Sequence, residues 1–306
     1  YRSAGGVLER ASAFSAVYAG TRTPVALPGR VPCPSLVFPN DEDYDYAKVV
    51  LDERSLGEAT RRLSSASDPL LRAMLWQTLW QMVRDGRWPT GSYAHLALTQ
   101  LSAENDVKTA AAVLETLYGR EPPAASVLRY MERPDVAAFE TLFLRQLDAA
   151  AASSDLQKLW FDAAVKAATT PRTLRILAGW LSAPPEGLDL DQDRRWAVIE
   201  RLAAMGAKDA AALIEAETRR DGSDKGLKAA VSARAAAPDA AVKRRWFNRL
   251  ADPLSKDTLS EQRAAMKGLF PREQDALRAS FSRDFFAALE TLAASKDDEF
   301  LSAFTE

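Results

Sequence analysis

The stretch FPNDEDYDYAKVVLDERSL, residues Phe38 to Leu56, separates two parts of the chain that differ in character. The sequence before it is rich in proline and glycine, which favours extended or irregular backbone. Nearly all of the sequence after it spaces apolar residues as helices do. The acidic part of the stretch fits a solvated turn or, alternatively, a hydrogen-bonded hinge between two domains. We interpret it as an interdomain joint, with these residues at its centre: Asn40, Asp41, Asp43 and Tyr46.

The segment before the joint cannot be helical in its second half, because four prolines lack the amide donor and fix their own φ: Pro24, Pro28, Pro32 and Pro34. Its short runs AFSAVY, PVAL and SLVF fit edge strands or extended connectors. Val49 to Leu51 is a further run of β type, and Asp52 behind it can cap a helix. The segment is too small to fold alone, so its apolar faces need a partner.

Helical spacing dominates from Glu53 onward. Asp68-Pro69 is a start signal, and the following LLRAMLWQTLWQMVRD is apolar on more than one face, which indicates a helix buried on two sides. Thr90, Asn105 or Asp106, Ser154 and Thr170 are expected caps, and Gly86 and Gly119 expected ends. The expected helices are 70–85, 91–101, 107–118, two that begin at Pro122-Pro123 and Pro134, 154–168, 171–181, 194–205, 209–220, 225–237, 239–251, 256–269 and 271–294.

These helices have short links and many alanines, which favour helix and let neighbouring axes approach closely. We predict a mainly α fold, an irregular α-solenoid of antiparallel helix pairs of the HEAT or armadillo kind, preceded by a short β segment. A compact bundle is the competing arrangement. The predicted domains are residues 1–52, which end with the joint, and residues 53–306, the helical body.

Composition narrows the functional classes. The 306 residues carry a formal net charge of -2, which argues against a general nucleic-acid binder. The single cysteine, Cys33, rules out an internal disulfide and is consistent with the cytoplasm, our expected location. No apolar run approaches the roughly 20 residues that span a bilayer, so we expect no membrane partner. Because the chain begins with Tyr1 rather than methionine, we expect it to be part of a longer protein.

The sequence offers little catalytic equipment. A metallopeptidase helix needs two histidines one turn apart, and a His/Cys zinc site needs several ligands, but the chain has one histidine, His95, and one cysteine. A serine or cysteine triad would have to use His95, and no G-x-S-x-G accompanies it. Phosphate-binding glycine loops are absent from the sequence. We therefore predict no catalytic residue, metal ligand or cofactor in this chain; a hydrolase that uses His95 is a weaker hypothesis.

Tryptophans and arginines are the remaining candidates for binding. The seven tryptophans lie in or beside apolar helical stretches, so core packing is the simplest interpretation and a ligand platform the alternative. Most basic clusters are expected on solvated helix faces. On the concave side of a solenoid, an arginine could instead pair with a carboxylate such as the C-terminus of a peptide. The peptide-binding candidates are Arg84, Arg87, Arg194, Arg195, Arg244 and Arg245.

Four segments carry a resemblance to a known family: PNDEDYDYAKVVLDERSL (39–56), DPLLRAMLWQTLWQMVRDGRW (68–88), RRWAVIERLAAMG (194–206) and LSEQRAAMKGLFPREQDALRASFSRDFFAAL (259–289). From about Leu36 to its end, the chain resembles the C-terminal half of the aminopeptidase N family of zinc metallo-aminopeptidases, in the form whose last domain is similar to that of the endoplasmic-reticulum aminopeptidases.

The resemblance implies that residues 1–52 are the tail of a small β-sandwich with its joint, and that the rest is a helical cap. The zinc ligands and catalytic glutamates of that family belong to domains outside this sequence. The partners it implies are the catalytic zinc domain of the same parent chain and peptide substrates, which the cap helps to select. A free-standing helical scaffold that binds a protein or peptide is the alternative.

Overall fold

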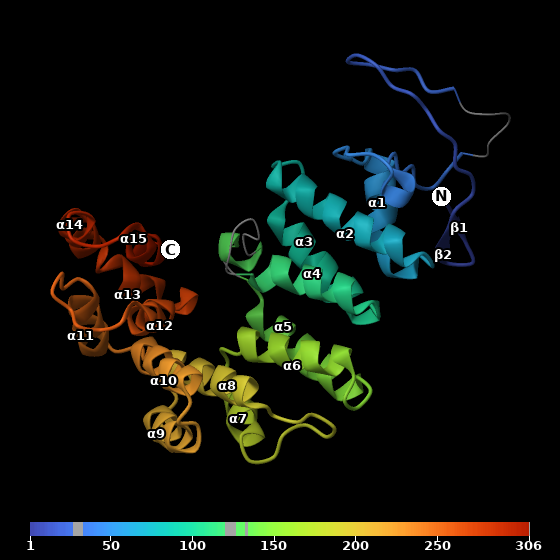
Figure 1. Cartoon of the computed structure of the whole chain (residues 1–306). Helices are drawn as coiled ribbons and strands as arrows, with labels where there is room; N and C mark the ends of the chain where they lie inside the picture. Colours follow the sequence, from blue (N-terminus) through green and yellow to red (C-terminus); the bar gives the residue numbers. More distant parts are fainter. Residues whose placement is uncertain (27–32, 120–126, 132–133, 306) are drawn as a thin grey trace. The chain divides into compact units, whose positions relative to one another are not determined.

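The computed structural model describes residues 1–26, 33–119, 127–131 and 134–305. The described residues contain fifteen α-helices and one small antiparallel sheet, which confirms the predicted mainly α fold with a short β segment before it (Figure 1). The chain divides into two compact units, Tyr1–Gln146 and Leu147–Glu306. The predicted domain boundary after residue 52 lies within the first unit and stays a prediction.

The first unit begins with a β-hairpin that sequence analysis did not predict. β1 (Arg2–Ala4) pairs with β2 (Val7–Glu9), and Gly5 and Gly6 join them with φ values of 57° and 91°. Two consecutive positive φ angles define the tight hairpin turn that glycine favours. Leu8 is 1% exposed and forms a parallel bridge with Ala66, so the hairpin is anchored beside the helices.

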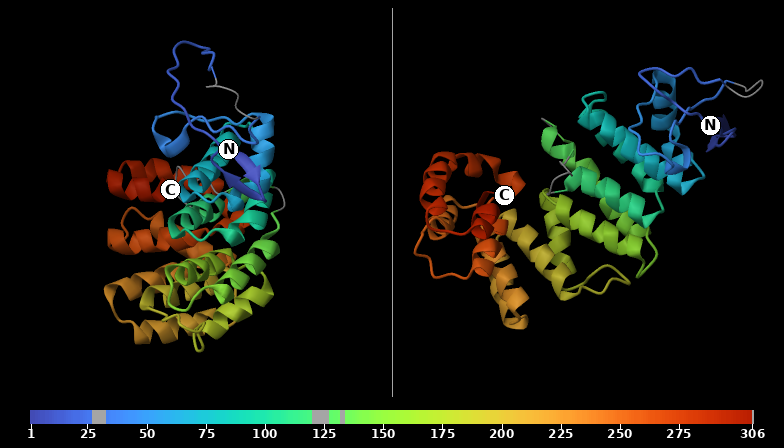
Figure 2. Two further views of the ribbon diagram at one scale, coloured as in Figure 1. Left: turned by 90° about the vertical axis from the view of Figure 1, so that its right-hand side faces the viewer. Right: turned by 45° about the horizontal axis from the view of Figure 1, so that its top comes forward.

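Residues 10–26 contain no strand and are exposed along almost their whole length, in a loop that extends from the first unit (Figure 2). The run AFSAVY is therefore an extended connector rather than a strand, and SLVF and Val49–Leu51 also form none. The run PVAL lies partly outside the described residues. β-branched and aromatic residues favour strands only where a partner strand completes the hydrogen bonds. Among the described residues, the backbone of SLVF forms backbone hydrogen bonds only with Tyr1, which is too short a pairing for a strand.

The helices of the first unit are α1 (Glu53–Arg62), α2 (Pro69–Arg84), α3 (Thr90–Gln100), α4 (Val107–Tyr118) and most of α5 (Val136–Ala149), whose last three residues belong to the second unit. Local chemistry sets most of their bounds. Asp52 caps α1 and Asp68 caps α2, as predicted, and Gly86 ends α2 with φ 68°. Asp106 caps α4 through a 2.8 Å bond from the Thr109 amide.

One predicted cap in this unit is wrong, because Pro89 rather than Thr90 stands at the N-cap of α3, and no side chain bonds there. Gly119 ends α4 as predicted, with a φ of −57° rather than a left-handed value. The helix expected from Pro122-Pro123 lies outside the described residues.

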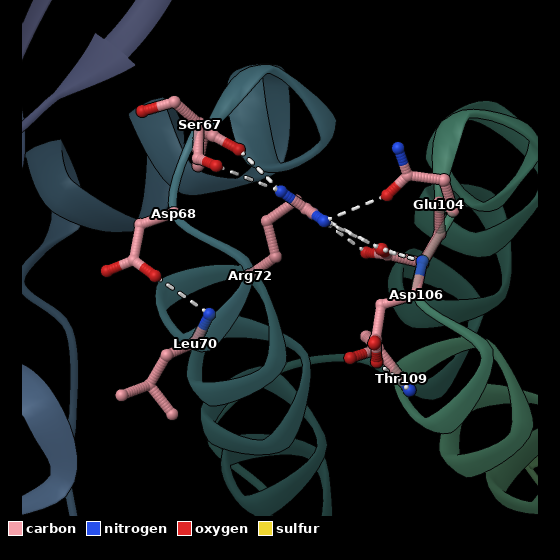
Figure 3. Close-up of polar contacts among 9 residues, drawn as sticks. Ser67, Asp68, Leu70, Arg72, Glu104, Asp106 and Thr109 are labelled. Atoms are coloured by element: carbon pink, nitrogen blue, oxygen red, sulfur yellow. Dashed lines mark hydrogen bonds and ion pairs between the residues drawn. The ribbon is translucent and has the colours of Figure 1, made fainter.

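A buried ion pair holds the start of α2 against the connection from α3 to α4 (Figure 3). The Arg72 Nε–H group donates to both carboxylate oxygens of Glu104, at 3.2 and 3.1 Å. The two side chains are 9% and 1% exposed. Arg72 also donates to the Ala66 carbonyl at 2.9 Å, and Glu104 accepts from the Asp106 amide at 3.1 Å. Because each charge has several partners, the pair can remain ionised away from water.

The second unit contains α6 (Asp155–Ala167), α7 (Pro171–Trp180), α8 (Gln192–Ala204), α9 (Ala210–Arg220), α10 (Asp224–Ala236), α11 (Ala240–Leu250), α12 (Leu259–Leu269), α13 (Asp275–Ala279), α14 (Ser282–Ala293) and α15 (Asp298–Thr305). Within it α6, α8, α10 and α12 pack in turn along one layer, and α7, α9 and α11 pack beside them as their neighbours in sequence. This alternation is the local arrangement of a helical solenoid.

Small residues let the layer pack closely, as the alanine content predicts. Ala230 and Ala233 of α10 are 0% exposed. A Cβ added to Gly268 of α12 would lie 2.1 Å from the backbone oxygen of Ser232, so the α12 backbone touches α10 directly there. Larger side chains at these positions would separate the two helices.

Side chains from later in the chain satisfy carbonyl groups at the ends of several helices. The Gln274 Nε2–H group donates to the carbonyls of Ala204 in α8 and Ala236 in α10, at 2.7 and 2.8 Å. The Arg201 Nε–H group donates to Ala168 at 2.7 Å, at the end of α6. The last carbonyls of a helix have no partner within the helix, so these side chains supply the missing hydrogen bonds.

The single helix expected over 271–294 is wrong, because the chain breaks there into a short 3₁₀ turn, α13 and α14. Phe281 stands at the break and packs against Phe247 and Phe270, with ring centroids 5.3 and 5.2 Å away. Aromatic packing thus overrides the local helical preference. The final helix, α15, was not predicted.

Candidate functional site

The acidic joint is an ordered turn built around Asn40, which is 8% exposed. Its side-chain oxygen accepts from the Asp45 amide at 3.0 Å, and its Nδ2–H groups donate to the Asp45 carbonyl and the Asp43 carboxylate at 2.8 and 3.0 Å. Glu42 and Asp43 adopt left-handed φ values of 60° and 56°. The stretch is thus a turn that is exposed over residues 42–48 and held by internal hydrogen bonds, and its role as a hinge between domains stays a prediction.

The joint also connects the N-terminal segment to the helices. The Asp41 carboxylate contacts the Tyr1 hydroxyl and forms an ion pair with Arg10 at 2.9 Å. The Lys48 ammonium group lies 2.8 Å from Asp85 at the end of α2, and its hydrogen bond lowers the pKa of that carboxyl group. Tyr46 is fully exposed and makes no such contact in the described part of the chain.

An open groove of about 810 Å³ separates α1 from α3. Its lining includes Arg61, Trp88, Ser92 and His95. His95 is exposed, and its imidazole makes no hydrogen bond to any described residue. A nucleophile needs a base within hydrogen-bond reach, and the groove provides no such pair among the described side chains. The groove therefore gives no support to a hydrolase that uses His95.

Core packing is confirmed for five of the seven tryptophans, namely Trp76, Trp160, Trp180, Trp196 and Trp246, which are at most 9% exposed. The other two, Trp80 and Trp88, are half-buried and pack around the Tyr93 ring at centroid distances of 5.8 and 6.3 Å. A half-buried ring that packs against a core tyrosine needs no ligand to explain it.

Three of the six peptide-binding candidates are occupied by neighbouring side chains. Arg195 binds Glu217 through two bonds of 2.9 and 2.8 Å, and Arg194 pairs with Asp162 and Asp191. Burial acts to raise the pKa of Glu217, but the Arg195 and Gln192 hydrogen bonds outweigh it and lower that pKa. Arg244 pairs with Asp284, and its guanidinium lies 4.2 Å from the Phe281 ring centroid. These arginines hold helices together.

The other three candidates, Arg84, Arg87 and Arg245, are exposed and form no ion pair with a described residue. They are free to bind an anionic group from outside. Among the described residues two cations are buried, Arg72 and Lys243, although the basic cluster that contains Lys243 is expected on a solvated helix face. Helical spacing gives a signal for Lys243, because it stands three and four residues before Trp246 and Phe247 and so shares their buried face.

The described residues contain no group of three or more His, Cys, Asp and Glu side chains that could hold a metal ion. They therefore do not fit a zinc centre. None of the helices in the described part of the chain is long and apolar enough to cross a membrane.

Comparisons with known proteins agree with the mainly helical fold. Residues 36–305 match the family model described as the ERAP1-like C-terminal domain. The chain is similar to a protein named aminopeptidase N from Streptomyces lividans, with 33% identity over 272 residues. The similarity covers 87% of this chain but 31% of that relative, so the chain spans less than a third of the relative's length.

Proposed function

This chain belongs to the family of ERAP1-like C-terminal domains, and from that premise we propose that it is the helical cap of a zinc aminopeptidase N. In this proposal the cap covers the active-site chamber and helps to select peptide substrates, while the zinc domain of the same parent chain removes N-terminal residues. The observation that carries the proposal is the 33% identity to an aminopeptidase N over 87% of the chain. The comparisons do not favour the free-standing scaffold.

The joint has a specific place in this proposal. Residues 1–52 would be the tail of a β-sandwich that precedes the cap, and the turn around Asn40 would fix the direction in which the chain enters α1. Support comes from the bonds of the turn itself and from the ion pair between Lys48 and Asp85. The exposed loop 10–26 would complete its backbone hydrogen bonds in that sandwich. We expect the parent enzyme in the cytoplasm.

Selection of peptides would use the unoccupied arginines. A guanidinium group binds a carboxylate through two parallel hydrogen bonds, so Arg84, Arg87 and Arg245 are the donors to test. In the parent enzyme, replacing Arg84 and Arg87 together by alanine should raise KM for peptides of about ten residues and leave turnover of a short aminoacyl-coumarin unchanged. Arg219→Ala is the control, because Arg219 is an exposed arginine on α9, in the other compact unit. An equal effect of both variants on KM would contradict the assignment of these arginines.

A separate assay tests whether catalysis belongs to the zinc domain and not to this chain. The purified 306-residue chain, with zinc added, should not hydrolyse aminoacyl-coumarin substrates, whereas the parent enzyme should. Robust turnover by the chain alone would refute the proposal. Deleting residues 53–306 from the parent, with folding of the remainder checked by circular dichroism, should broaden the range of peptide lengths that it accepts.

A further inference from the structure

Lys243 of α11 is a fully buried cation without a counter-ion, which is rare because a buried charge normally has a partner of opposite sign. Lys243 is 0% exposed. The Nζ–H group donates to the Ala235 carbonyl at 2.8 Å, and the Phe270 ring centroid lies 5.8 Å from Nζ. No carboxylate of a described residue forms an ion pair with it.

Most charged groups on the elements packed around α11 pair with other groups, and Arg283 and Glu290 of α14 are exposed. The pairs are Arg234 of α10 with Glu215, Lys267 of α12 with Glu200, Glu273 with Arg201, Asp284 of α14 with Arg244, Glu299 of α15 with Arg263, and Arg249 of α11 itself with Asp257. Asp239 caps α11 through the Val242 amide. Arg245 is exposed. Burial alone therefore determines the protonation of Lys243.

The contact lies at a junction between helices. Lys243 donates a hydrogen bond to the carbonyl of Ala235, and Gln274 donates one to the next carbonyl, that of Ala236. Two side chains from later elements thus pair the carbonyls at the end of α10. The Gln274 Oε1 atom is buried and accepts no hydrogen bond from a described residue. One buried polar atom at this junction therefore lacks a hydrogen bond within the described part of the chain. A junction with an unpaired polar atom opens more easily than an apolar contact does.

We propose that Lys243 is a proton-sensitive contact that couples pH to the packing of α11 against α10 and α12. With a neutral amine the junction stays closed. When the amine takes up a proton, opening exposes the ammonium group to water and so becomes more favourable. This inference does not depend on the proposed function, because it concerns the chain itself.

The pH range follows from the burial of the amine, which lowers the pKa of Lys243 to about 7. In the open state the amine is hydrated and keeps its proton up to its ordinary pKa. Between these two values the open state binds one more proton than the closed state, so opening becomes less favourable as pH rises. Below the lower value both states are charged, and opening no longer depends on pH.

Hydrogen exchange measured by mass spectrometry on the full chain from pH 6 to 9 tests this, after correction for the intrinsic pH dependence of exchange. The opening constant of α11 should be constant below about pH 7 and fall by roughly tenfold per pH unit above it. Lys243→Met should abolish this slope. Lys256→Met, which changes an exposed lysine in the loop after α11, should retain it. Peptides from α2 serve as an internal reference.

A flat profile in the unmodified chain, or a slope that survives in Lys243→Met, would overturn the proposal. If Lys243→Met does not fold, the unmodified chain still decides the matter through the lysine ¹³Cε resonances. One resonance that titrates near pH 7 supports the proposal, and titration of all of them near pH 10 overturns it.

Discussion

Each of the two units buries a cation that donates to an alanine carbonyl, but the two cations have different surroundings. In the first unit Arg72 bonds to Ala66 at 2.9 Å and also to the carboxylate of Glu104. In the second unit Lys243 bonds to Ala235 at 2.8 Å and has no carboxylate partner. The first contact is an electrostatically complete pair, whereas the second is a hydrogen bond to a carbonyl without a counter-charge.

The difference teaches that burial alone does not indicate what a charge contributes. Removing one member of a satisfied pair leaves the other charge buried and unpaired, so it costs stability. Removing a cation without a partner eliminates an existing penalty, so it increases stability. The two units should therefore respond with opposite sign to the same type of substitution.

The largest expected effect is in the first unit. Arg72→Met should lower the free energy of unfolding by about 3–5 kcal/mol, because Glu104 would remain buried without a partner. Urea denaturation, with hydrogen exchange in α2 as the local probe, measures the loss. Lys158→Ala, which removes an exposed pair with Asp155, should cost less than about 1 kcal/mol. Equal losses in the two variants would show that the Arg72 pair contributes no more than a surface pair.

The second effect has the opposite sign. Lys243→Met should raise the free energy of unfolding at pH 6, because removing a buried charge without a counter-ion relieves more than the roughly 1 kcal/mol that a lost hydrogen bond to the Ala235 carbonyl costs. The folded-state pKa of about 7 lies below the unfolded value, so the gain should shrink as pH rises from 7 toward 10. Denaturation at pH 6 and pH 9 compares the two values. A loss of stability at pH 6 would contradict the contrast between the units.

The third prediction tests the close packing of α12 against α10 in the second unit. Gly268→Ala should lower stability by about 1–3 kcal/mol, because the new methyl group would meet the Ser232 backbone. Gly179→Ala in α7 is the matched control, since an added Cβ meets nothing there and alanine favours helix by up to about 1 kcal/mol. If both variants are stabilised, α10 and α12 do not pack as closely as described.

The smallest effect concerns the joint. Lys48→Ala removes an exposed ion pair with Asp85 and should lower the melting temperature slightly at neutral pH. The Lys48 ammonium lowers the pKa of Asp85, so the contribution of this pair is present at neutral pH and is lost as pH falls and the carboxyl takes up a proton. Melting curves at pH 7 and pH 3 should therefore differ between the variant and the unmodified chain only at pH 7.

Helix starts were the part of the fold that sequence predicted best, because caps are local chemistry. The caps Asp68, Ser154 and Thr170 each accept a backbone hydrogen bond at a helix start, as expected. The break at Phe281 could not be predicted, since it depends on rings more than ten residues away in the chain. The hairpin at the N-terminus was missed because its strands are three residues each, too short to show alternation.

The candidate site was less predictable than the helix starts, because its ion pairs depend on residues far apart in the chain. Arg194 and Arg195 form one basic cluster in the sequence. Arg194 has one partner near its own helix start, Asp191, but the other partners, Asp162 and Glu217, stand on other helices. Charge patterns along one helix cannot reveal such pairs. Arg84, Arg87 and Arg245 differ from them in being exposed and in forming no ion pair with a described residue, and both are properties of the folded chain.

The bonds from Gln274 to Ala204 and Ala236 span 70 and 38 residues. During synthesis on the ribosome, the carbonyls of Ala204 and Ala236 can therefore accept these hydrogen bonds only after residue 274 has emerged. Vectorial folding of the second unit then finishes late, and a nascent chain that stops before this glutamine would expose both helix ends to chaperones and proteases.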